Sequence, residues 1–207
     1  AQALVKEHGQ RISAISADSR TDLPPYTVMR VEKDGIQNYL INLPKKRSYT
    51  EIYDNPKVTE IVTKLLAEIE PDLVHLHCLQ DIGAGVITAA KGLNLPVVLS
   101  VHDFWWICER QFMINRAGVY CAQDPVNIEN CRSCVDNWSR AKTRSDTLFA
   151  MAAQADLITY PSQFALDLAL KSGLKGQADA VLGNGVHWPS NDFSAKVLAR
   201  RAAAPRP

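Results

Sequence analysis

The chain has 207 residues, of which 46% are hydrophobic and 22% charged, the balance of an ordinary globular protein with a sizeable core. Lysine and arginine number 23 against 22 acidic residues, and the net charge of +1 excludes a strongly basic field that would hold nucleic acid. No apolar run approaches the roughly 18 residues that a membrane helix needs, and no charged-then-apolar leader opens the sequence.

The first part of the chain predicts a helix, a strand and a hairpin. Residues 1–8 carry helix formers that Gly9 can terminate, and a buried strand is expected from Ile12. Two extended runs between residues 28 and 41 flank Asp34-Gly35, a pair that favours a tight turn. Because a helix in an α/β fold follows a strand, we expect this sequence to begin one strand late.

The rest of the chain predicts alternating helices and strands. A helix opens at Pro56, because apolar residues from Val58 to Ile69 recur at steps of three and one. The later elements, in order, are a strand at 72–77, a helix at 82–91, a strand at 95–101, a helix at 138–154, a strand at 157–160, a helix from 162 to 173 and a strand at 180–182. This alternation predicts a doubly wound α/β sheet, in which ligands bind beyond the carboxyl ends of the strands.

Four candidate site residues are expected at that edge of the sheet: His77, His102, Ser162 and Asn184. A strand-terminal histidine can bind a ligand or be satisfied by backbone, and both readings are open for His77 and His102. Asp103 can orient the His102 ring or cap the next turn. Ser162 is interpreted first as a helix cap, and the aromatic run 104–106 as buried packing rather than a stacking platform.

A long segment, residues 107–136, contains four of the five cysteines: Cys108, Cys121, Cys131 and Cys134. Cys131-Arg132-Ser133-Cys134 is half of a zinc-site pattern, because two thiolates two residues apart can wrap one tetrahedral ion. All four thiolates together would make a closed structural zinc site that orders the segment. Disulfides, with three pairings, and free thiols are the alternatives.

Two smaller features are read as structural. Cys78 has no nearby cysteine in the sequence and is expected to be a small buried hydrophobic residue. The basic cluster Lys45-Lys46-Arg47 is expected to be solvated surface, with a phosphate or membrane role as the alternative.

The motifs resemble, in their order along the chain, the N-terminal domain of family 4 glycosyltransferases. Those that carry the resemblance are His75-x-His77, Val101-His102-Asp103, the turn at 160–164 and Asn184-Gly185-Val186. A subset with a His-Asp-Phe-Trp-Trp run followed by spaced cysteines looks closer still, as residues 102–134 do here. The resemblance covers roughly residues 1–190, and the shared order is more specific than any single motif.

The resemblance implies the N-terminal, acceptor-side half of a retaining GT-B enzyme of the hexosyltransferase type, with a Rossmann-like parallel sheet and helices on both faces. It implies a catalytic role for His102 and substrate contacts from His77, Asp103, Ser162, Asn184 and Gly185. The implied partners are a nucleotide-sugar donor and a sugar or lipid-linked acceptor, with no nucleic acid and no catalytic metal. We expect a cytoplasmic protein, with peripheral association at the inner face of the membrane left open.

Two parts of the family pattern have no counterpart in this sequence. The glycine-rich turn after the family's first strand would precede Ala1, and residues 191–207 leave no room for the second domain with its Glu-x7-Glu motif. Residues 191–207 are interpreted as a linker, or equally as a disordered terminus. We therefore expect a fragment that is inactive alone. The alternative is a noncatalytic, zinc-stabilised α/β interaction module.

Overall fold

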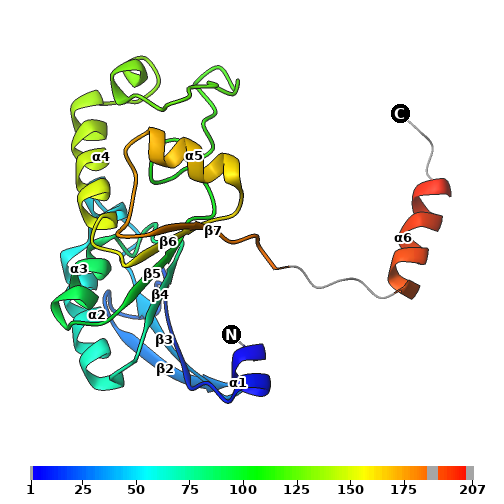
Figure 1. Ribbon diagram of the computed structural model, residues 1–207. Coiled ribbons are helices and arrows are strands. Elements are labelled where there is room, and N and C mark those ends of the chain that lie inside the picture. The colour runs from blue at the N-terminus through cyan, green and yellow to red at the C-terminus, as the bar shows by residue number, and fades with distance from the viewer. Residues whose placement is uncertain (1, 186–190, 204–207) are drawn as a thin grey trace.

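The computed structural model describes residues 2–185 and 191–203, and residues 2–185 form two β-sheets with helices packed on them (Figure 1). The first sheet has the order β1-β3-β2, with β1 (Ile12–Asp18) parallel and β2 (Val28–Lys33) antiparallel to β3 (Ile36–Asn42). Asp34 and Gly35 have φ angles of 55° and 74°, as the predicted tight hairpin turn requires. Helix α1 (Gln2–His8) reaches this turn, where Gln2 donates a hydrogen bond to Asp34.

The second sheet has four parallel strands in the order β4-β5-β6-β7. These strands are β4 (Val74–His77), β5 (Val97–Ser100), β6 (Leu157–Tyr160) and β7 (Asp179–Val181). Helix α2 (Pro56–Ile69) packs on α3 (Gly85–Gly92), and α3 packs on α4 (Trp138–Ala152), so the three helices form one layer (Figure 1). Helix α5 (Gln163–Lys171) lies between β6 and β7 in the chain and packs on both strands.

Helix α2 illustrates how local sequence sets the element boundaries. The Asn55 side chain accepts a hydrogen bond from the Val58 backbone N–H at 3.3 Å, and Pro56 occupies the first turn. Glu70 ends the helix in a left-handed conformation with φ of 48°. The apolar stripe of α2 is buried at Val58 and Val62, against a core that includes Val97 and Leu99 of β5.

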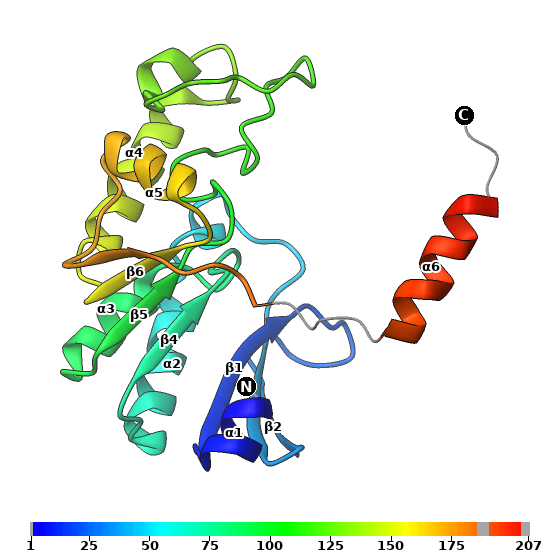
Figure 2. The same cartoon turned by 45° about the vertical axis from the view of Figure 1, so that its right-hand side comes forward.

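The continuous sheet expected for a Rossmann-like fold is divided into two. Within the described residues, β1 and β4 each pair with a strand on one side only, and Figure 2 shows them as the facing edges of the two sheets. On β4, Val74 and Leu76 pack against the core while His75 and His77 are exposed on the opposite face. The two histidines therefore lie on the face that α2 and α3 leave uncovered.

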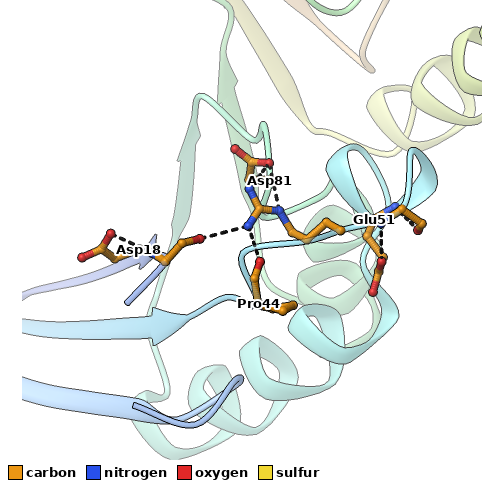
Figure 3. A network of polar contacts seen from close by, with 7 residues as sticks. Asp18, Pro44, Glu51 and Asp81 are labelled. Carbon is orange, nitrogen blue, oxygen red and sulfur yellow. Dashed lines mark hydrogen bonds and ion pairs between the residues drawn. The ribbon is translucent and has the colours of Figure 1, made fainter. Parts of the chain in front are cut away.

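Arg47 connects the two halves at the carboxyl ends of β1 and β4, in the network whose Pro44 and Asp81 are labelled in Figure 3. Its guanidinium donates to Ser19 Oγ at 2.9 Å, to the Pro44 carbonyl at 2.7 Å and to Asp81 Oδ1 at 2.8 Å. Ser19 follows β1, whereas Asp81 follows β4. The prediction of a solvated basic cluster is confirmed for Lys45 and Lys46 but wrong for Arg47, whose side chain is only 16% exposed.

Residues 191–203 of the tail form helix α6 (Asn191–Ala203), and the interpretation of residues 191–207 as a linker stays a prediction. The remaining tail residues, 204–207, and the Val186 end of the turn at 184–186 lie outside the described residues. None of the helices in the described ranges is long and apolar enough to cross a membrane.

Candidate functional site

Two histidines meet at the carboxyl ends of β4 and β5. His77 is the last residue of β4 and is in register with Ser100, while His102 follows β5 by two residues. His77 Nδ1 lies 2.8 Å from His102 Nε2, and the two rings stack with centroids 5.1 Å apart. The structure thus places both predicted histidines at the expected edge and pairs them through one hydrogen bond, in which one imidazole donates and the other accepts.

A third histidine, which the sequence analysis named only within the His75-x-His77 motif, extends this pair along β4. His75 Nε2 lies 2.8 Å from Ser100 Oγ, and Ser100 Oγ lies 2.8 Å from Thr159 Oγ1. The His75 and His77 ring centroids are 4.1 Å apart. The signal was the i, i+2 spacing of the two histidines, which places both on one face of a strand.

The surroundings favour neutral imidazoles on β4. Burial lowers the pKa of His75, and a charge on His102 would lower it further. Burial also lowers the pKa of His77, with further lowering by charges on His75 and His102. A neutral His77 can share a single proton with His102, so the pair suits hydrogen bonding to a sugar hydroxyl better than binding of an anion.

Asp103 caps the turn that follows His102. Its Oδ1 accepts the Trp105 backbone N–H at 2.8 Å, and its Oδ2 accepts Gln111 Nε2 at 2.6 Å. Of the two readings left open by the sequence, the structure supports the cap. Gln111 belongs to the cysteine segment, so this carboxylate also joins that segment to the edge that carries His102.

An apolar cavity of about 120 Å³ opens beside His102, between the turn after β5 and helix α5. Its apolar walls include Phe104, Trp106 and Phe164, and its polar groups are His102, Asp103 and Ser162. Ser162 Oγ accepts the Ala165 backbone N–H at 3.2 Å, which confirms the predicted helix cap. His102 thus sits where an apolar pocket meets the polar strand ends.

The other predicted substrate contacts lie further from this arrangement. Asn184 and Gly185 are exposed on the stretch that follows β7, and neither lines the cavity beside His102.

Cys78 was predicted to be buried, and this is wrong. It is exposed, with a φ of 45°, and lines a small cleft with Gln80 and Asp103 on another side of His102. The turn out of β4 directs its side chain away from the core.

Buried aromatic residues support the turn after His102. Trp105 and Trp106 are 5% and 4% exposed and pack edge to face, which confirms the packing interpretation for both. Arg144 of α4, which the sequence analysis missed, donates to the Trp105 carbonyl at 2.6 Å and lies 4.7 Å from the centre of its ring. Burial lowers the pKa of Arg144, and the nearby Tyr49 and Glu109 counteract this.

The four cysteines of segment 107–136 are half-buried and are not joined by disulfides in the structure. Burial raises the pKa of the Cys108 thiol, and charges on Cys121 and Cys134 would raise it further. Burial likewise raises the pKa of Cys131, which interacts electrostatically with the other three. Within residues 2–185 and 191–203, no three His, Cys, Asp or Glu side chains are arranged to ligate a metal, and the zinc site stays a prediction.

Solved structures with this fold define its class. A sucrose-phosphate synthase from Thermosynechococcus elongatus is 13% identical over 98% of this chain and 92% of its own, with a TM-score of 0.54. An alpha,alpha-trehalose 6-phosphate synthase from Burkholderia multivorans is 10% identical over 98% of this chain and 47% of its own, with a TM-score of 0.51. The likeness establishes an α/β fold that matches the Rossmann-like half of a GT-B enzyme. This chain spans about half the length of the second protein.

The sequence itself gives the family. Residues 1–187 match the family described as Glycosyltransferase Family 4. This chain therefore belongs to glycosyltransferase family 4. A search of curated proteins finds no significant match.

Proposed function

We propose that this chain is the acceptor-side half of a retaining glycosyltransferase, which moves a sugar from a nucleoside diphosphate to an acceptor hydroxyl. The observation that carries the proposal is the placement of His102. It lies at the carboxyl ends of the parallel strands, hydrogen-bonded to His77 and beside a cavity, in a chain that belongs to a glycosyltransferase family. This edge of a parallel sheet is where ligands bind in α/β folds.

The site suits sugar recognition more than phosphate recognition. Glycosyl transfer builds positive charge on the sugar ring and negative charge on the departing diphosphate. His102 Nε2 forms the hydrogen bond to His77, which leaves Nδ1 free to bond with a sugar hydroxyl. The polar wall of the cavity consists of His102, Asp103 and Ser162, with no lysine or arginine in its lining. The cationic donors for the diphosphate then have to come from outside this cavity.

In this proposal residues 1–190 form the acceptor-side domain and residues 191–207 lead toward a donor-binding domain. Asp103 and His77 act as positioning residues for the His102 edge. Ser162, Asn184 and Gly185 are assigned to the rim of the cleft between the domains. The apolar cavity beside His102 accommodates an uncharged part of the acceptor, because its walls at Phe104, Trp106 and Phe164 bury apolar surface.

The test uses the protein made from the complete reading frame around this sequence. It is incubated with a panel of nucleoside diphosphate sugars and with sugar, sugar-phosphate and lipid-linked acceptors, and release of the nucleoside diphosphate is measured. We expect acceptor-dependent release with one donor. NMR of the product should show the anomeric configuration of the donor. Release with none of the pairs would favour a noncatalytic interaction module, and an inverted product would contradict the retaining mechanism.

A further inference from the structure

We propose that Cys108, Cys121, Cys131 and Cys134 bind one structural zinc ion, which holds segment 107–136 against the wall of the His102 site. This inference does not depend on glycosyl transfer. It rests on how the backbone of the segment brings the four cysteines together, and each link is a contact of the structure.

The first link joins Cys108 to Cys121 through one buried residue, Met113. The Cys108 carbonyl accepts the Gln111 backbone N–H at 2.9 Å, and Gln111 precedes Met113 by two residues. The Met113 carbonyl in turn accepts the Cys121 backbone N–H at 2.8 Å. Met113 is 1% exposed, so this backbone bridge lies inside the segment.

The second link is the turn that holds Cys131 and Cys134. The Cys131 carbonyl accepts the backbone N–H groups of Cys134 at 2.8 Å and Val135 at 3.2 Å. Two residues between cysteines in such a turn allow both sulfurs to face one ion.

Two side chains connect the cysteine pairs. Gln123, two residues after Cys121, donates to the Cys131 sulfur at 3.6 Å. Arg116, from the turn between the bridged residues Ile114 and Tyr120, donates to the Cys134 carbonyl at 3.1 Å and pairs with Asp136. Both pairs therefore belong to one compact unit. Zinc ligation requires the four sulfurs to turn toward one point, because the described side chains are not arranged to ligate a metal.

The segment has little else to order it. Its buried side chains are Ile107, Met113 and Val135, whereas Phe112, Val119 and Tyr120 are exposed. Three residues close to the cysteines, Gln111, Met113 and Ala122, have positive φ angles of 64°, 56° and 53°, which cost non-glycine residues about 1 to 2 kcal/mol each. A segment of this length without a core is usually ordered by a further constraint, and four thiolates on zinc supply one.

The donor set determines the type of site. Four sulfurs fill the tetrahedral shell of zinc and leave no position for water, so the ion is structural rather than catalytic. Its effect on the His102 site passes through Gln111, which lies between Cys108 and Met113 in the chain and hydrogen-bonds to Asp103.

The test measures the metal in protein purified without added zinc, using the full chain or the complete protein. Elemental analysis should give about one zinc per chain, and titration with a mercurial should release it stoichiometrically. Cys134→Ser should reduce the zinc content at least tenfold, whereas Cys78→Ser, at a cysteine outside the segment, should leave it unchanged. Circular dichroism shows whether each variant is folded.

A second readout does not depend on variants. Replacement of zinc by cobalt should give the sulfur-to-cobalt charge-transfer band and the visible bands of a tetrahedral all-sulfur site. The proposal is overturned if the protein holds no zinc, takes up no cobalt and, while folded, lets all five of its cysteine thiols react with the mercurial. It is equally overturned if mass spectrometry shows disulfides among the four cysteines.

Discussion

His77 Nδ1 and His102 Nε2 share one hydrogen bond of 2.8 Å. The last residue of β4 therefore holds the orientation of the imidazole that follows β5. The parallel register makes this contact possible, because His77 lies opposite Ser100 and His102 follows Ser100 by two residues. The hydrogen bond occupies His102 Nε2 and leaves Nδ1 for a ligand. His77 is therefore a positioning residue in the proposed site.

Replacement of His77 by Phe, which keeps a planar ring but cannot hydrogen-bond, should release His102 from a single tautomer. Nitrogen-15 NMR of this chain should show one His102 tautomer in the parent protein and a mixture in His77→Phe. In the complete protein we expect kcat to fall about tenfold with KM little changed, as loss of positioning alone implies. An unchanged His102 spectrum would remove the positioning role.

The histidines of β4 should make stability depend on pH. Their folded-state pKa values lie below the ordinary value of 6.5, so the folded protein binds fewer protons than the unfolded chain. Their contribution is therefore complete above about pH 6.5 and is lost as the pH falls toward their lower folded values. The double variant His75→Gln, His77→Gln should show a smaller decrease in the free energy of unfolding over this range. A difference between parent and variant that does not change with pH would contradict the lowered pKa values.

Arg47 should contribute to stability although its lysine neighbours do not. Arg47→Met removes the guanidinium that donates to the Ser19 hydroxyl, the Pro44 carbonyl and the Asp81 carboxylate. We expect the free energy of unfolding to fall by about 1 to 3 kcal/mol. Lys46→Met, at an exposed neighbour, should change stability by less than about 0.5 kcal/mol. Urea unfolding of the two variants compares them directly. Equal effects would mean that the connection in Figure 3 is energetically unimportant.

Arg144 should stabilise the turn that follows His102. Arg144→Ala leaves a cavity under Trp105 and removes the donor to its carbonyl, for an expected loss of about 2 to 4 kcal/mol. Arg140→Ala, on the same helix but exposed, serves as the control and should stay within about 0.5 kcal/mol of the parent. Tryptophan fluorescence should also change in Arg144→Ala, because Trp105 loses the guanidinium over its ring. The same fluorescence and stability in both variants would contradict this role.

The features that the sequence predicted are those set by local patterns. The stripe from Val58 to Ile69 predicted α2, and Asp34-Gly35 predicted the hairpin turn, because neighbouring residues alone determine both. The apolar strand runs placed His77 and His102 at one edge of the sheet. The cysteine spacing predicted a zinc site, which stays a prediction that the metal analysis tests.

The features that the sequence did not predict depend on distant partners. Arg47 finds Asp81, 34 residues away, so nothing in its basic neighbourhood indicated a connection between sheets. The His77–His102 contact depends on the register of two strands, which their composition does not encode. Cys78 is exposed because the backbone turns at the end of β4. Arg144 lies on the buried stripe of α4 with Ala141 and Leu148, and the partner of its charge, the Trp105 carbonyl, is 39 residues away in the sequence.

The central claim, that His102 serves sugar transfer, is tested most directly by turnover of the complete protein with His102→Ala. The matched control is His8→Ala, at an exposed histidine in α1. We predict that His102→Ala lowers kcat/KM by about a hundredfold or more, a loss of about 2.7 kcal/mol of transition-state stabilisation, while the melting temperature and the His8→Ala activity stay at parent values. Near-normal transfer by a folded His102→Ala protein would contradict the account.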